Sequence, residues 1–158
     1  MAAPPARERV LRFLDDLRAA EAAAAEVLVA WLAVCTLDGL RGGLRAIAER
    51  EAVHADLLAE RLRELDAPRT ATVAEPVQRA ALARFGSAAV ADEEKLGLLL
   101  ARYPEDSAVT HPIAEILDDL DHDLETRELL ALIADGEAAT LGWFRAYHAG
   151  LARAANSG

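Results

Sequence analysis

Apolar residues recur every three to four positions along most of this chain. This spacing is typical of amphipathic α-helices that pack against one another. Alanine, leucine, glutamate and arginine dominate, while aromatic residues make up 4% and runs of β-branched residues between turn signals are missing. A chain of 158 residues is long enough for one domain with a core and short for two. We therefore predict a single all-α domain over residues 1–158.

Proline and glycine divide the chain into five expected helices. The glycine-rich stretch 38–43 predicts a turn, and Pro104 and Pro112 bound a later break. Gly86 separates a helical piece that starts near Pro76 from the next long helix. The expected helices cover residues 6–36, 44–65, 87–103, 113–120 and 123–154.

The lengths of the connections predict the topology. The first two expected helices are joined by a short turn and must be antiparallel, whereas about twenty residues separate the second from the third. A helix of about twenty residues is about 30 Å long, and about ten extended residues cover that distance. We therefore expect one long crossover between two helical hairpins, rather than a simple up-and-down arrangement.

The charge balance limits the partners of the protein. Seventeen basic and twenty-seven acidic residues give a net charge of −10, which repels nucleic acids and anionic membranes and favours metal cations. The longest apolar run, 27–35, is too short to span a membrane, and Asp15 and Asp16 interrupt any signal-peptide pattern. Cys35 is the single cysteine, so no internal disulfide forms. We expect a cytoplasmic protein.

Two polar residues lie on the apolar stripe of the helix expected over 44–65. Glu51 and His54 form a Glu-x-x-His motif, and residues three apart share one face of a helix. A carboxylate and an imidazole placed in this way can reach one cation between helices. The alternative is a neutral or hydrogen-bonded pair in the core.

Carboxylates lie on the inward stripes of the first and last expected helices as well. In 6–36 the stripe includes Glu21, and Glu26 lies on a neighbouring face lined by alanine. In 123–154 Glu137 lies in the middle of the stripe. We expect Glu21 and Glu137 to point inward, with a solvent-exposed glutamate as the alternative for Glu21.

The helix expected over 87–103 has a less distinct pattern. Its polar face is expected to comprise Asp92, Lys95 and Arg102. This orientation leaves Glu93 and Glu94 flanking the apolar face, so we expect one of them to point inward. The alternative is that both are solvated, which is common for adjacent glutamates.

A glutamate on each long helix, with Glu-x-x-His on the second, is the arrangement of di-iron carboxylate bundles. The sequence resembles the bacterioferritin branch of the ferritin-like family, and residues 51–56 and 122–130 carry most of the likeness. The resemblance implies a ferritin-like four-helix bundle with one long crossover between helices 2 and 3. The implied iron ligands are Glu21, Glu51, His54, Glu94 and Glu137.

The chain departs from the family pattern at three positions. Thr140 stands where a complete site has histidine, so the second ion lacks one ligand. Leu28 replaces a tyrosine that often follows the first glutamate. Ala52 replaces the methionine through which bacterioferritins bind haem, so we expect no haem.

The resemblance implies a ferroxidase-type function, in which one or two iron ions per chain are bound and Fe(II) is oxidised by oxygen or peroxide. It also implies a homo-oligomer, whether a dimer, a ring or a shell. Two alternatives stay open. The chain is a ferritin-like domain that has lost oxidase activity and serves as a structural or interaction module, or its carboxylates hydrogen-bond within a metal-free bundle.

Overall fold

The computed structural model describes residues 4–105 and 108–156, and every regular element in this part of the chain is helical. The elements are α1 (Pro4–Val34), α2 (Asp38–Glu64), α3 (Glu75–Phe85), α4 (Asp92–Ala101), α5 (His111–Leu117), the 3-10 helix η1 (Asp118–Leu120) and α6 (Leu124–Asn156). The predicted all-α class is confirmed. Within the same residues, no helix combines the length and hydropathy that crossing a bilayer requires.

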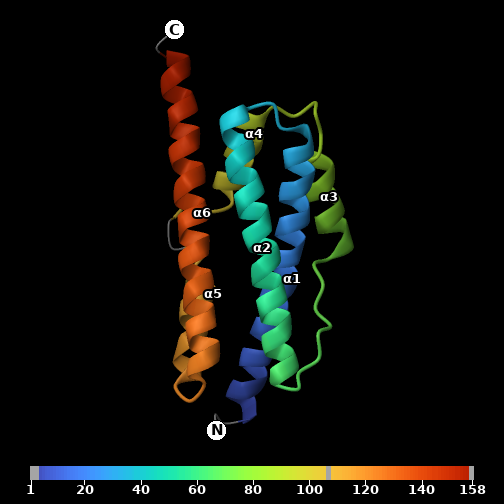
Figure 1. The fold of residues 1–158 in the computed structure, drawn as a ribbon, viewed down its shortest axis with the longest axis vertical. Helices are drawn as coiled ribbons and strands as arrows, with labels where there is room; N and C mark the ends of the chain where they lie inside the picture. The colour runs from blue at the N-terminus through green and yellow to red at the C-terminus, as the bar shows by residue number, and fades with distance from the viewer. Residues whose placement is uncertain (1–3, 106–107, 157–158) are drawn as a thin grey trace.

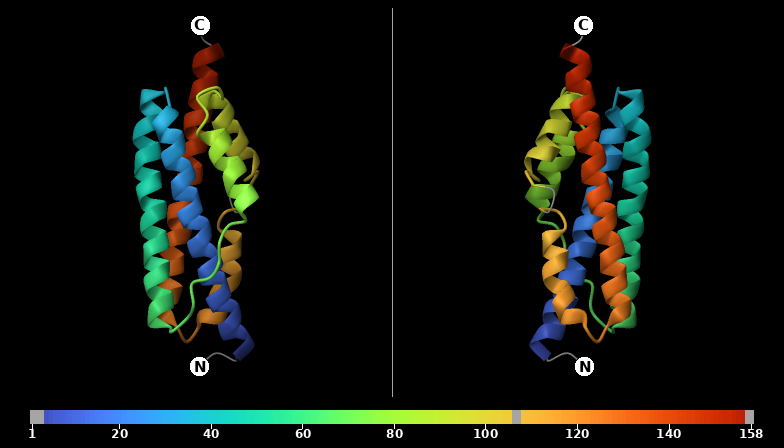
Figure 2. Two further views of the ribbon diagram at one scale, coloured as in Figure 1. Left: turned by 90° about the vertical axis from the view of Figure 1, so that its right-hand side faces the viewer. Right: turned by 90° about the vertical axis from the view of Figure 1, so that its left-hand side faces the viewer.

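Three long helices dominate the structure, and α2 packs against both α1 and α6 (Figure 1). α1 and α2 form an antiparallel hairpin. After α2 the chain returns along the molecule through an extended segment and α3, which packs on α1 (Figure 2). It then reverses, and α4 and α5 follow one another down the side of α6. One position beside the long helices is therefore filled by two short helices with a break between them.

The helix expected over 44–65 begins earlier, at Asp38, because glycine has a packing role there. Gly43 lies under the indole of Trp143, and a Cβ atom at this position would come within 2.0 Å of the ring. The stretch 38–43 is therefore helical rather than a turn. The expected turn is wrong because glycine here admits a side chain from α6.

The helical piece expected near Pro76 is confirmed as α3, which begins at Glu75 and ends at Phe85, directly before Gly86. The helix expected over 87–103 is shorter than expected, because residues 86–91 are not helical. α4 begins only at Asp92. The carboxylate of Asp92 accepts hydrogen bonds from Trp31 Nε1 at 2.7 Å and from Thr36 N at 2.8 Å, so it ties the start of α4 to the end of α1.

The expected facing of α4 is wrong. Asp92 and Lys95 are buried, at 7% and 0% exposure, whereas Glu93 and Glu94 are exposed. The apolar run 96–100 is nearly continuous, so the sequence shows no narrow stripe that determines which side of α4 faces inward. Tertiary contacts made by Asp92 decide it.

Lys95 offers a direct test of this orientation, because its Nζ is buried and has no hydrogen-bond partner among the described residues. A buried ammonium without a partner costs stability. We expect Lys95→Met to raise the free energy of unfolding by about 1–3 kcal/mol. Urea denaturation followed by circular dichroism measures the change. Lys95→Arg keeps the charge and should give no gain, and a Met variant less stable than the wild type would contradict the orientation.

Candidate metal centre

A polar layer separates two apolar clusters along the long helices. The first cluster includes Trp31 and Phe144, and the second, nearer the start of α1, includes Leu14 and Leu130. Each of α1, α2 and α6 brings a polar side chain to the level between them. We refer to this group as the carboxylate–histidine cluster, and its members are Glu21, Glu51, His54 and Glu137.

The cluster is compact enough to surround one ion. Each side chain offers one ligand atom, and these atoms all lie within 4.8 Å of one another. His54 Nδ1 lies 3.2 Å from Glu21 Oε2 and 3.8 Å from Glu137 Oε1. Glu21 and Glu51 are each 4% exposed, and His54 is 8% exposed. The donors therefore converge from three helices on a site that is largely shielded from water.

Local sequence explains how the imidazole fits. Glu51 and His54 are three residues apart on α2, so both side chains reach the same level of the interior. Opposite them, Gly136 on α6 leaves room for the ring, because a Cβ atom there would lie 3.1 Å from His54 Cε1. Glu137 follows directly. Gly136 therefore makes space for a site residue.

Burial changes the protonation of every member of the cluster. Desolvation raises the pKa of Glu51 to about 8, helped by the neighbouring Glu21 carboxyl. Desolvation likewise raises the pKa of Glu21 to about 7 and that of Glu137 to about 7, and repulsion among the carboxylates adds to both. Desolvation lowers the pKa of His54. Without a cation, the cluster therefore holds protons on carboxyls at neutral pH while its imidazole is neutral.

The charges and donors fit a divalent cation. Arg50 lies close enough to lower the pKa of all three carboxyls, and its Nε is buried without a hydrogen-bond partner. When all three carboxyls are deprotonated, their charges and that of the Arg50 guanidinium sum to two negative charges. Glu51 Oε1 and Glu137 Oε1 are also buried without hydrogen-bond partners. Carboxylate oxygens with one imidazole suit Fe(II), Mn(II) or Zn(II), and a divalent ion would satisfy these atoms.

The structure brings together four of the five residues named from the sequence. Glu94 is exposed on α4 and lies outside the carboxylate–histidine cluster, so its expected inward position is wrong. Glu26 is exposed too and accepts a hydrogen bond from Gln78 of α3, which leaves Glu21 as the inward carboxylate of α1. The role of the four as metal ligands stays a prediction.

Sequence reasoning missed Arg50. It is four residues before His54 on α2, and residues four apart share a face, so its spacing could have identified it as a neighbour of the site. The guanidinium of Arg50 supplies a positive charge beside the carboxylates.

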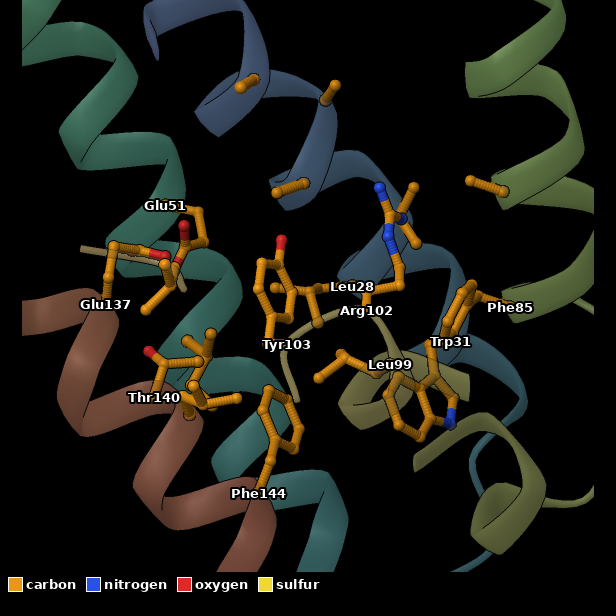
Figure 3. A pocket seen from close by; sticks show the side chains of 18 of the residues that line it. Leu28, Trp31, Glu51, Phe85, Leu99, Arg102, Tyr103, Glu137, Thr140 and Phe144 are labelled. Atoms are coloured by element: carbon orange, nitrogen blue, oxygen red, sulfur yellow. The ribbon is translucent and has the colours of Figure 1, made fainter. Parts of the chain in front are cut away.

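Beside the cluster lies a cavity of about 260 Å³, which we call the apolar cavity (Figure 3). Glu51, Glu137 and Thr140 lie together at one end of it, and aromatic side chains including Trp31 and Phe144 line the other parts. Two members of the carboxylate–histidine cluster, Glu51 and Glu137, therefore border the cavity.

No protein-family model, curated protein or solved structure matches this chain. The function is therefore inferred from the carboxylate–histidine cluster, its charges and the apolar cavity beside it.

Proposed function

We propose that the protein is a ferritin-like metalloprotein that binds one iron ion per chain at the carboxylate–histidine cluster, where oxygen or peroxide accepts electrons from Fe(II). The observation that carries the proposal is the convergence of three carboxylates and one imidazole within 4.8 Å, from three helices, in a buried layer. Burying that many carboxyls is costly unless a cation or protons neutralise them.

The path of the chain supports the ferritin-like part of the proposal. A hairpin of α1 and α2, a long crossover and a return through α4 and α5 to α6 is the connection of ferritin-like bundles. In such bundles the helix after the crossover supplies a carboxylate to a second ion. Here that position is broken between Ala101 and His111, and Glu94 is exposed. We therefore propose one ion rather than two.

The residues of the chain would act by exchanging protons for the cation. At neutral pH a carboxyl with a pKa of about 8, such as Glu51, is mostly protonated and must release its proton to become a ligand. His54 is already neutral, because burial lowers its pKa, so its lone pair is available. Arg50 offsets part of the remaining negative charge. Bound iron would supply one-electron redox chemistry, and the surrounding apolar clusters limit the access of water to it.

The test of this proposal is iron stoichiometry after anaerobic Fe(II) loading, followed by the rate of Fe(II) oxidation in air. We expect one ion per wild-type chain. Thr140 lies one turn after Glu137 on α6, and its Oγ1 is buried without a hydrogen-bond partner. Thr140→His adds an imidazole there, so we expect the stoichiometry to rise towards two and the oxidation rate to rise with it.

Thr140→Val is the control, because it changes the same position without adding a ligand. It should bind one ion, as the wild type does. Two ions on the wild-type chain would contradict the single site. A wild-type chain that binds no iron would favour the second candidate, a ferritin-like interaction module without metal, which the broken position at α4 and α5 and the missing histidine at Thr140 support.

A further inference from the structure

The apolar cavity exists for a reason that is visible in the sequence and the fold. On its α1 side, the chain presents Ala20, Ala23 and Ala24, whose side chains are too short to fill the space. Residues at the end of α4 and in the connection to α5, among them Leu99, Tyr103 and Val109, also line the cavity, and the described residues of that connection are not helical. Larger side chains on α1 would fill this space.

The size and lining of the cavity favour an organic molecule over water. An apolar cavity of about 150 Å³ stays dry and accommodates benzene. A space of about 260 Å³ lined by side chains such as Trp31, Phe85 and Leu99 therefore suits a body of two fused aromatic rings or an alkyl chain of similar volume. Burial of such a body provides the affinity.

One end of the cavity is polar and has unused hydrogen-bonding capacity. Glu51 Oε1, Glu137 Oε1 and Thr140 Oγ1 are all buried without hydrogen-bond partners, and the three residues line the cavity together (Figure 3). Glu51 is 4% exposed. A carboxyl oxygen and a threonine hydroxyl can each accept a hydrogen bond, so this end favours a ligand with a hydroxyl group.

We propose that the apolar cavity binds a small neutral organic molecule with one hydroxyl group. This hydroxyl donates a hydrogen bond to the carboxyl group of Glu51 or Glu137 and accepts one from Thr140 Oγ1, and the apolar body of the molecule fills the space between α1, α3 and α6. The molecule then lies against Glu51 and Glu137 of the carboxylate–histidine cluster. The part of this inference that places the molecule beside a metal ion rests on the proposed function. Binding of the organic molecule itself requires only the cavity and the three residues at its polar end.

The competing occupant is an organic acid in the opposite orientation. Arg102 also lines the cavity, away from the polar end formed by Glu51, Glu137 and Thr140 (Figure 3). A carboxylate on the ligand would be held there. Arg102 is exposed, so water and salt screen its attraction for an anion, whereas the hydrogen-bonding atoms at the polar end are buried. We therefore expect the neutral molecule to bind more tightly than the acid.

The experiment is a calorimetric titration of 2-naphthol and of 2-naphthoate into metal-free and iron-loaded protein, with Trp31 fluorescence as a second readout. We expect one 2-naphthol per chain, bound at least about 10-fold more tightly than 2-naphthoate. Thr140→Val should weaken 2-naphthol by about 5-fold, the worth of one neutral hydrogen bond, and leave naphthalene unchanged. Equal or tighter binding of 2-naphthoate that Arg102→Gln abolishes would overturn the proposal.

Filling the cavity provides the matched test of location. Ala24→Phe should abolish 2-naphthol binding, whereas Ala33→Phe, the same change at an exposed position of α1, should not. If Ala24→Phe does not fold, Ala81→Phe fills the cavity from α3. No saturable binding to the wild type, or equal loss in both α1 variants, would refute the site.

The titrations also separate this inference from the proposed function. The iron content of each sample is measured independently. Saturable 2-naphthol binding to a chain that takes up no iron would leave the cavity site standing and reject the metal centre. Iron bound without 2-naphthol binding would do the reverse.

Discussion

Replacing Glu51 with glutamine is expected to weaken Fe(II) binding by more than about 100-fold. Loss of a residue that only hydrogen-bonds to a metal ligand weakens binding by up to about 100-fold, and Glu51 is proposed as a ligand itself. Glu51 is a member of the carboxylate–histidine cluster, and its Oε1 is buried without a hydrogen-bond partner. Glu94→Gln makes the same change at a residue that is exposed on α4 and is expected to leave affinity unchanged. Comparing these two variants tests whether iron binds at the carboxylate–histidine cluster alone or also at Glu94, which the sequence resemblance had included as a ligand.

Anaerobic titration calorimetry of both variants measures this difference, and circular dichroism confirms that each is folded. The glutamine side chain has nearly the shape of glutamate, so packing changes little. Because the substitution also removes a buried ionisable group, Glu51→Gln should be at least as stable as the wild type without metal. Equal loss of iron binding in the two variants would place the metal elsewhere.

Metal-free protein is expected to melt about 10 °C lower at about pH 8 than at about pH 5.5. The pKa values of Glu21, Glu51 and Glu137 in the folded chain are about 7, 8 and 7, above their usual 4.5. The folded state thus binds more protons than the unfolded state, and stability falls as pH rises from about 4.5 to about 8. A net loss of about 3 kcal/mol lowers the melting temperature by about 10 °C in a chain of this size.

His54 has the opposite effect over the lower part of this range. Its pKa is lowered in the folded chain, so the unfolded state binds the extra proton and stability from this group rises with pH up to about 6.5. One imidazole offsets only part of the change from three carboxyls. The measured trend should therefore keep the sign set by the glutamates.

Differential scanning calorimetry in the presence of a chelator, at both pH values, measures the decrease. Glu51→Gln should show a smaller one, because it lacks the carboxyl with the highest pKa. Anaerobic Fe(II) should raise the melting temperature more at about pH 8 than at about pH 5.5, since the cation binds the deprotonated carboxylates. A metal-free protein that becomes more stable with rising pH would contradict the protonated state of the cluster.

Several features of the site could be predicted from residue spacing. Glu51 and His54 share a face of α2 wherever that helix packs, because three residues span nearly one turn. Glu21 and Glu137 lie in distinct apolar stripes, and the helical spacing of those stripes predicts that both point inward. The neighbouring Glu26 is exposed and accepts a hydrogen bond from Gln78 of α3, so it is not the inward carboxylate of α1.

The amino-acid sequence alone determined the all-α class, the two long helices that begin and end the chain, and the carboxylates and histidine of α1, α2 and α6. These features depend on local spacing, which a helix preserves in any surroundings. Only the tertiary structure decided the start of α2, where Trp143 packs on Gly43, and the facing of α4, where Asp92 binds Trp31. It also decided the cavity beside the cluster. Each of these features depends on contacts between side chains that are far apart in the sequence, and local sequence patterns do not predict such contacts.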